Sequence, residues 1–158
     1  MSNKTAKAKK KGSEGNAGAE SDKREQKLQA VLMADSFTST FRPLSWEIPK
    51  VLMPLANVPM LEYTVEFLTQ NGVEEILVVC VWHAKLVQKF VDNLVSTKNV
   101  AVRCIPMPGC RSAGDALREL DTLGLVRSDP FVLISGDVVA NIDLKKVSTG
   151  CSKLPSFY

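Results

Sequence analysis

Four short runs of mostly apolar residues, separated by longer amphipathic stretches, constrain the fold of this chain most strongly. The runs lie at Leu28–Ala34, Glu75–Trp82, Val100–Ile105 and Phe131–Ile134. Strands with such continuous apolar sequence are typical of a parallel sheet that is covered on both faces. Because helical stretches alternate with the runs, the sequence predicts an α/β domain with a parallel, Rossmann-like sheet and right-handed crossovers.

Three stretches between the runs have apolar residues at helical spacing. They predict helices over Met60–Asn71, Ala84–Val95 and residues 112–123. Ser112 begins the third helix and Asp115 follows three positions later, which resembles a capping box. Residues 35–59, in contrast, contain four prolines and are expected to form mostly ordered loop, because proline disrupts helices.

The composition is that of one ordinary globular domain. Of the 158 residues, 45% are hydrophobic and 23% are charged, which excludes a wholly disordered chain. The apolar runs are far shorter than the roughly 18 residues of a membrane span, so no membrane association is expected.

The four cysteines form no C-x-x-C pair and the chain has one histidine, so no metal site is predicted. Cys80 and Cys104 lie in apolar runs and are expected to behave as small buried hydrophobic residues. This use of cysteine fits a reducing compartment, and we expect the protein in the cytosol.

Charge divides the chain into a basic start and a nearly neutral body. Residues 1–28 carry eight basic and four acidic side chains, whereas the remaining residues carry twelve and thirteen. Residues 1–26 contain no aromatic residue and no Leu, Ile or Val, so a disordered tail is predicted there. The run Lys7–Lys11 would suit contact with RNA, but a solvated, solubilising tail is favoured because aromatic residues for stacking are absent.

Polar residues follow two of the predicted strands and point to a candidate site. Parallel α/β folds bind ligands beyond the carboxyl ends of their strands. Asp35 follows the first strand, and Gly136-Asp137 follows the fourth. The loop after the first strand has no glycine before Gly72, and it offers Asp35 and the bulky Phe37 instead. Both residues oppose a phosphate group, since a phosphate cradle needs exposed backbone amides.

The segment from Ala30 to Leu44, followed by Pro49-Lys50, resembles the opening of sugar-phosphate nucleotidyltransferases. Residues 112–117 resemble the Thr-Ala-Gly segment that this family has near its nucleotide. The resemblance implies that Lys50 and Asp137 match functional positions, with Asp137 in place of the family's metal-binding aspartate. It also implies that the family's three loop glycines and its catalytic loop arginine are replaced by Asp35, Ser36, Thr38 and Thr40.

The body resembles more specifically the epsilon subunits of eukaryotic translation initiation factor 2B. The match covers about residues 27–147, and the residues that carry it lie at 34–37, 54–58, 62–64, 111–115, 125–129 and 136–138. The resemblance implies a role in guanine-nucleotide exchange on initiation factor 2 within a multi-subunit complex. In that family the nucleotidyltransferase-like domain serves for assembly, and a C-terminal helical domain carries the exchange activity.

The resemblance implies a division into a disordered basic tail (1–26), the N-terminal part of a nucleotidyltransferase-like domain (27–147) and a tail of different character (148–158). Since 148–158 do not resemble the family's continuation, a truncated or alternatively spliced form with an incomplete domain is expected. We therefore expect a non-catalytic assembly module whose partners are the other subunits of the complex and, through them, initiation factor 2. No cofactor and no catalytic residue are expected, and Lys50 and Asp137 are interpreted as vestigial positions of a nucleotide site.

An active sugar-phosphate nucleotidyltransferase is the alternative hypothesis. In that case Lys50 would bind phosphate and Asp137 would bind magnesium, with Asp143 as a candidate for a second ligand. Without such a role, Lys50 is a surface charge after a proline and Asp137 is a loop residue or a helix cap. The loss of the loop glycines favours the non-catalytic interpretation.

Overall fold

The computed structural model describes residues 27–35, 37, 41–98 and 101–151. The tail predicted at 1–26 lies outside the described residues, as do residues 152–158 of the segment predicted to differ from the family.

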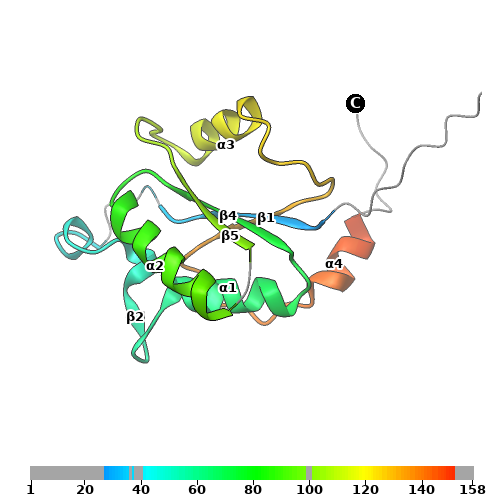
Figure 1. Ribbon diagram of the computed structural model, residues 1–158, viewed down its shortest axis with the longest axis horizontal. Helices are drawn as coiled ribbons and strands as arrows, with labels where there is room; N and C mark the ends of the chain where they lie inside the picture. Colours follow the sequence, from blue (N-terminus) through cyan, green and yellow to red (C-terminus); the bar gives the residue numbers. More distant parts are fainter. Residues whose placement is uncertain (1–26, 36, 38–40, 99–100, 152–158) are drawn as a thin grey trace, which may run out of the picture.

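Four parallel strands form the central sheet in the order β5-β4-β1-β6 (Figure 1). They are β1 (Gln29–Met33), β4 (Glu75–Cys80), β5 (Ala101–Pro106) and β6 (Val132–Ser135). Each lies within two residues of a run predicted as a strand, so the predicted α/β class with a parallel sheet is confirmed. The chain starts in the middle of the sheet, moves outward to β5 and then returns to the other side of β1. The direction of winding therefore reverses between β1 and β6.

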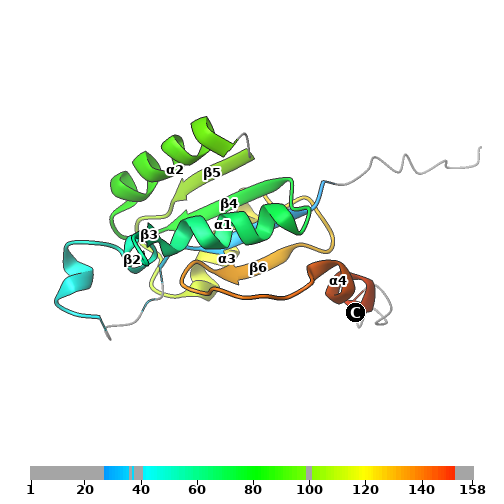
Figure 2. The ribbon, with the colours of Figure 1, turned by 90° about the horizontal axis from the view of Figure 1, so that it is seen from below.

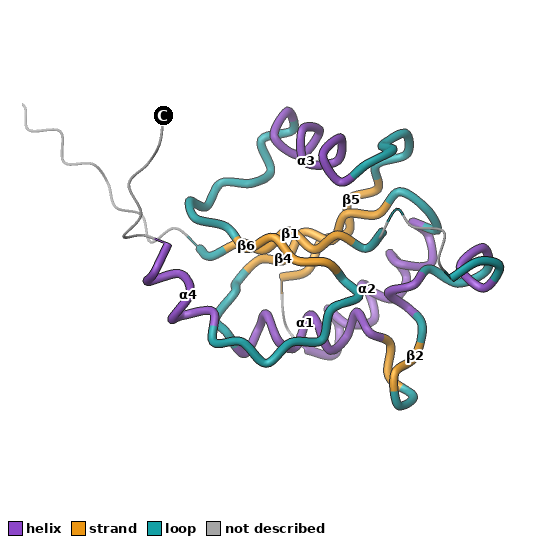
Figure 3. The backbone as a smooth tube through the Cα atoms, turned by 180° about the vertical axis from the view of Figure 1, so that it is seen from behind, coloured by secondary structure: helices purple, strands orange, loops and turns teal. Residues whose placement is uncertain are grey.

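Helices cover both faces of the sheet. The helices α1 (Met60–Gln70) and α2 (Ala84–Lys98) lie on one face and α3 (Ala113–Thr122) lies on the other, as Figure 3 shows with the sheet nearly edge-on. All three agree with the predicted helices. The predicted cap is also present, since Ser112 Oγ accepts a hydrogen bond from the Asp115 amide at 3.2 Å. No helix in the described part of the chain is long and apolar enough to cross a bilayer.

The strands are apolar throughout because both of their faces are covered. In β1, Ala30 and Leu32 belong to the core on the α1 and α2 side, whereas Val31 and Met33 belong to the core on the α3 side. All four side chains are buried. Burial of a Val or Leu side chain contributes about 1.5–3 kcal/mol, so this short central strand anchors two packed layers.

The proline-rich segment between β1 and α1 contains more regular structure than the sequence suggested. It holds two 3₁₀ turns, η1 (Leu44–Trp46) and η2 (Lys50–Leu52), each preceded by a proline. In each turn the proline carbonyl accepts the closing hydrogen bond, at 2.9 Å in both cases. A proline suits this position because it has no amide hydrogen of its own to satisfy. The described part of the segment is otherwise mostly loop, as the prolines predicted, and it contains no α-helix.

A small antiparallel hairpin follows the second 3₁₀ turn. Its strands are β2 (Pro54–Leu55) and β3 (Val58–Pro59). The two turn residues, Ala56 and Asn57, have φ angles of 49° and 68°. Two successive positive φ values are typical of the type I′ turn, which matches the twist of a two-residue hairpin. Asparagine accepts this conformation readily, whereas alanine is the less usual residue there.

A fourth helix, α4 (Leu144–Cys151), was not predicted and crosses the proposed domain boundary at residue 147. Asn71 at the end of α1 fixes its first turn, because Asn71 Oδ1 accepts a hydrogen bond from the Leu144 amide at 2.9 Å. Asp143 Oδ1 accepts further bonds from the Lys145 and Lys146 amides at 3.1 and 3.4 Å. Figure 2 shows α4 at the amino end of the sheet, far from η1 and η2. The proposed division of the chain stays a prediction.

The Gln29 side chain ties β1 to the segment before β6. Its Oε1 accepts hydrogen bonds from the amides of Arg127 and Ser128 at 2.5 and 2.9 Å. Its Nε2 donates to Glu75 Oε2 at 2.7 Å and to the Leu125 carbonyl at 3.2 Å. Gln29 is 3% exposed, so these bonds satisfy an amide that would be costly to bury alone.

We expect Gln29→Ala to lower the free energy of unfolding by about 1–2 kcal/mol, because two backbone amides lose their acceptor. Urea unfolding followed by circular dichroism measures this change. Gln88→Ala is the matched control, since the Gln88 amide donates to Asp92 in an exposed i,i+4 pair on α2 and its loss costs less than about 0.5 kcal/mol. Equal losses of unfolding free energy in the two variants would contradict the conclusion that the hydrogen bonds of Gln29 stabilise the fold.

Candidate functional site

The carboxyl ends of β1 and β6 meet where the winding of the sheet reverses. In open α/β sheets, ligands bind in the crevice at such a switch point. Gly136 follows β6 and its amide donates to the Met33 carbonyl of β1 at 2.8 Å, which joins the two strand ends. Asp35 and Asp137, the two acidic residues that the sequence analysis singled out, follow these strands.

Lys50 and Asp137 form an ion pair at this point. Lys50 lies at the start of η2, and its Nζ is 2.5 Å from Asp137 Oδ2. Ser135 donates its hydroxyl to the other carboxylate oxygen of Asp137. The Lys50 ammonium also lies 4.8 Å from the centre of the Phe41 ring, a cation–π contact. The 3₁₀ turn thus directs the lysine toward the strand end, and both charges are compensated.

Close packing holds the Asp137 loop in place. A Cβ atom added to Gly136 would lie 2.8 Å from Leu32 Cδ2 and 2.8 Å from Val51 Cγ1. Thr64 on α1 is buried, and its hydroxyl lies 3.3 Å from the Gly136 carbonyl and 3.2 Å from the Val138 carbonyl. The loop is therefore pinned between β1, η2 and α1, on both sides of Asp137.

The Asp35 carboxylate accepts hydrogen bonds from the two backbone amides that follow β4. Its Oδ2 accepts hydrogen bonds from the amides of Val81 and Trp82, the latter at 3.2 Å. Burial raises the pKa of the Asp35 carboxyl above 3.8, against the effect of these two amides and of His83. Amides that point into the crevice are the groups that would bind an anion, and here an internal carboxylate already occupies them.

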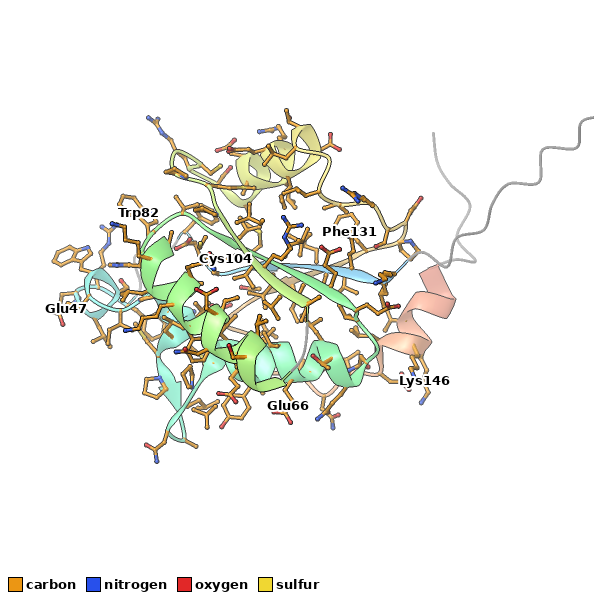
Figure 4. All side chains as sticks on the ribbon, in the orientation of Figure 1. Glu47, Glu66, Trp82, Cys104, Phe131 and Lys146 are labelled. Carbon is orange, nitrogen blue, oxygen red and sulfur yellow. The ribbon has the colours of Figure 1, made fainter. Side chains whose placement is uncertain are left out.

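A pocket of about 570 Å³ opens beside these residues. Its cationic side chains are Arg42, Lys50 and Arg111, and Asp35 is the acidic side chain among its lining residues. Trp82 lies at this end of the molecule in Figure 4, together with Glu47. The remaining lining residues are Ala34, Phe37, Ser45, Trp46, Pro49, Trp82, His83 and Cys110.

Only part of this pocket was predicted from the sequence. Asp35, Phe37 and Lys50 were predicted to lie near the site and all line the pocket, whereas Arg42 and Arg111, which also line it, were missed. Arg111 lies just before α3, far from Lys50 in the sequence. Whether the two residues line the same pocket therefore depends on the order of the strands in the sheet. The predicted replacements at residues 36, 38 and 40 lie outside the described part of the chain.

The arrangement fits a magnesium ion poorly. Both oxygens of Asp137 are engaged, one by Lys50 and one by Ser135, so a cation would have to displace an ammonium group. Asp143, the candidate for a second ligand, caps α4 instead and lies toward the end of the sheet where Figure 4 places Lys146. Over the residues that the structure describes, no group of three or more His, Cys, Asp or Glu side chains could hold a metal.

The Lys50–Asp137 pair predicts a specific pH dependence of stability. Burial alone would raise the pKa of Asp137, but the hydrogen bonds from Lys50 and Ser135 and the charge of Lys50 lower it below 3.8. A carboxyl whose pKa is lowered by folding contributes stability above its unfolded pKa of about 4, and this contribution is lost as the pH falls through the folded pKa.

Asp137→Asn is therefore expected to cost about 1 kcal/mol near neutral pH, and the cost should shrink as the pH falls below about 4. Thermal unfolding of both proteins across this range measures the difference. Lys50→Met provides the second comparison. In a protein that carries Lys50→Met, the stability cost of Asp137→Asn should depend less on pH than it does in the unmodified protein. A difference that stays constant from neutral to acidic pH contradicts the ion pair.

Comparisons with known proteins agree with this architecture. Residues 29–153 match the nucleotidyl transferase family. The chain is 41% identical over 134 residues to the translation initiation factor eIF2B subunit epsilon of Dictyostelium discoideum, covering 84% of this chain and 19% of that protein. It is 44% identical over 130 residues to the corresponding subunit of Schizosaccharomyces pombe, covering 80% of this chain and 19% of that protein. The chain thus spans about a fifth of the length of these relatives.

A solved structure shows the same fold. The structure of HddC from Yersinia pseudotuberculosis in complex with GMP-PN superposes with a TM-score of 0.67 at 21% sequence identity, over 80% of this chain and 55% of that chain. This likeness supports the parallel sheet and its helices, as the family match does over most of the chain. The chain belongs to the nucleotidyl transferase family.

Proposed function

We propose that this chain acts in translation initiation, as part of an epsilon subunit of initiation factor 2B, the guanine-nucleotide exchange factor for initiation factor 2. The identity of 41% and 44% to epsilon subunits of two distant eukaryotes supports this assignment. In this proposal the nucleotidyltransferase-like domain is a non-catalytic assembly module in the cytosol, needs no cofactor and contacts the other subunits of the complex. Exchange itself depends on parts of the factor other than this domain.

The observation that carries the non-catalytic assignment is the charge compensation within the pocket. Lys50 is neutralised by Asp137 at 2.5 Å, and the amides of Val81 and Trp82 are taken by Asp35. A phosphate group entering the pocket meets the half-buried carboxylate of Asp35, and it must also compete with Asp137 for the lysine. Both effects weaken the binding of a nucleoside triphosphate.

The edge of the sheet supports a role in assembly. Within the described residues β6 pairs with β1 alone, so its other side offers unpaired backbone groups. Leu133 in β6 is 51% exposed, and Val139 and Ile142 in the following loop are 55% and 52% exposed. Exposed apolar side chains on an unpaired strand and in the segment after it are typical of a surface that a partner covers.

Co-purification with the other initiation factor 2B subunits tests the proposal. The tagged full chain is co-expressed with those subunits, and the recovered proteins are identified by mass spectrometry. We expect recovery of the subunits with the unmodified chain and loss of recovery with Leu133→Glu. Leu123→Glu is the matched control, because Leu123 follows α3 and is exposed to a similar degree, 54%. Absence of the subunits from the unmodified chain contradicts the proposal.

An active sugar-phosphate nucleotidyltransferase is the second candidate. It is favoured by the resemblance of Lys50 and Asp137 to functional positions of the family, together with a pocket of about 570 Å³ that Lys50 lines. Its test is pyrophosphate release from nucleoside triphosphates mixed with sugar 1-phosphates and magnesium. We expect no release above that of Lys50→Met, and release that depends on Lys50 would establish the second candidate instead.

A further inference from the structure

Two free cysteines face each other across neighbouring strands. Cys80 is the last residue of β4, and Cys104 lies in β5. The register pairs Cys104 with Val78, two residues before Cys80, so both thiols lie on the same face of the sheet. Their sulfur atoms are 3.2 Å apart. The two strands thus hold the thiols in contact without a covalent bond between them.

The two thiols have unequal surroundings. Cys80 is completely buried in the core beneath α2, whereas Cys104 is half-buried at the margin of that core. Figure 4 shows Cys104 on β5, close to α2. Cys104 is therefore the member of the pair that a small molecule from solvent can reach.

A hydrogen bond between the two thiols shifts their pKa values in opposite directions. The bond from Cys80 lowers the pKa of Cys104, against the opposing effects of burial and of Asp92. The same bond, together with burial, raises the pKa of Cys80. The thiolate is the reactive form of cysteine, so the accessible thiol is also the one favoured as nucleophile.

We propose that Cys80 and Cys104 are an oxidation site, at which hydrogen peroxide closes a reversible disulfide between β4 and β5. The deprotonated Cys104 sulfur attacks one peroxide oxygen, so that an S–O bond forms, the O–O bond breaks, and the departing hydroxide takes up the proton that Cys104 released. The product is a sulfenic acid at Cys104 and one water molecule.

Cys80 completes the reaction as the resolving thiol. Its sulfur attacks the Cys104 sulfur, an S–S bond forms and the S–O bond breaks. The hydroxyl group leaves with the proton of Cys80 as a second water molecule. Two thiols have then lost two electrons, and one peroxide has been reduced to two waters. The sulfur atoms, 3.2 Å apart, must approach by about 1 Å to reach the disulfide distance.

The bond lies next to the pocket. Cys80 immediately precedes Val81 and Trp82, whose amides bind Asp35. Movement of Cys80 toward β5 therefore acts on the same amides that hold the Asp35 carboxylate. Trp82 is largely exposed at this position, so its fluorescence offers a reporter of the change.

Peptide mapping after peroxide treatment tests the proposal on the full chain. Trypsin releases Cys80 in residues 51–85, but it leaves Cys104 and Cys110 together in residues 104–111. The experiment therefore uses Cys110→Ser, in which the second peptide carries Cys104 alone. Cys110 is not needed for the pair, since its thiol bonds Glu119 Oε2 at 3.0 Å and its pKa is raised to about 11. Remaining thiols are alkylated before digestion, and circular dichroism confirms that each variant is folded.

We expect a cross-linked peptide of residues 51–85 and 104–111 that disappears on treatment with a dithiol reductant. Cys104→Ser should abolish the link and leave Cys80 as a free thiol, which is alkylated once the protein has been denatured. Cys80→Ser should instead accumulate a sulfenic acid at Cys104, which a cyclic diketone reagent traps. The proposal is overturned if both thiols remain reduced at peroxide concentrations that oxidise Cys151. It is equally overturned if the link forms only between separate chains, as a mixture of isotope-labelled and unlabelled protein reveals.

Discussion

Replacing Gly136 with alanine is expected to lower the free energy of unfolding by about 2–3 kcal/mol. The added Cβ atom would lie 2.8 Å from Leu32 Cδ2 and from Val51 Cγ1, and 3.2 Å from the Met33 carbonyl oxygen. Real side chains do not approach so closely, so β1, η2 or the Asp137 loop must move. Because cores are closely packed, such a shift costs energy rather than being absorbed by empty space.

A glycine elsewhere in the chain supplies the control. Gly114 lies in α3, and a Cβ there would meet only Ser112 Oγ, at the ordinary contact distance of 3.8 Å. Gly114→Ala is expected to leave stability unchanged or to raise it by about 0.5–1 kcal/mol, because alanine favours the helix. Urea unfolding of both variants gives the comparison, and equal effects would contradict the packing argument.

A double-mutant cycle locates the clash. Val51→Ala removes the methyl group that Gly136→Ala would meet, so the double variant should lose less stability than the sum of the single variants. A coupling of about 1 kcal/mol is expected for side chains in direct contact. Strict additivity would show that the added methyl group is accommodated without contact with η2.

Removing the carboxylates of Asp35, which lines the pocket, and of Asp137, which pairs with the pocket residue Lys50, is expected to strengthen polyphosphate binding by about tenfold or more. In the double variant Asp35→Asn/Asp137→Asn, the side-chain amide oxygen introduced at position 35 can still accept hydrogen bonds from the Val81 and Trp82 amides, but the negative charge at this position is gone. Lys50 also loses its counter-charge and becomes available to an anion. Isothermal titration with tripolyphosphate measures the affinity of the variant and of the unmodified chain at the same ionic strength.

Two further variants separate this effect from a general change in charge. Glu47→Gln removes an exposed acid at the end of η1 and should leave the affinity nearly unchanged. Adding Lys50→Met to the double variant should remove most of the gain, because the freed ammonium supplies it. If the unmodified chain already binds tripolyphosphate as tightly as the double variant, the two carboxylates do not weaken phosphate binding.

The parts of the fold that were predicted correctly depend on neighbours in the sequence. Continuous apolar runs mark buried strands, and apolar residues at helical spacing mark α1 to α3, because each pattern reports which side of a local element faces the core. The Ser112–Asp115 cap lies within a single turn, and the structure contains it at 3.2 Å. Such features need no knowledge of the order of the strands.

The parts that were missed depend on contacts across the fold. The α4 segment contains Val147, Thr149 and Gly150, which favour a helix only weakly. Its start is set by Asn71, which is distant in sequence and accepts a hydrogen bond from the Leu144 amide. A segment with weak local preference becomes helical when tertiary contacts satisfy its first amides.

By itself the sequence determined the class of the fold, its strands and main helices, and the presence of Asp35 and Phe37, with no glycine before Gly72, in the segment after the first strand. Only the tertiary structure decided that Lys50 pairs with Asp137, that Asp35 takes the amides after β4, and that Cys80 meets Cys104. These partners lie 24 to 87 residues apart. The order β5-β4-β1-β6 brings them together, and local periodicity does not encode that order, because strands with the same pattern can be arranged in several ways.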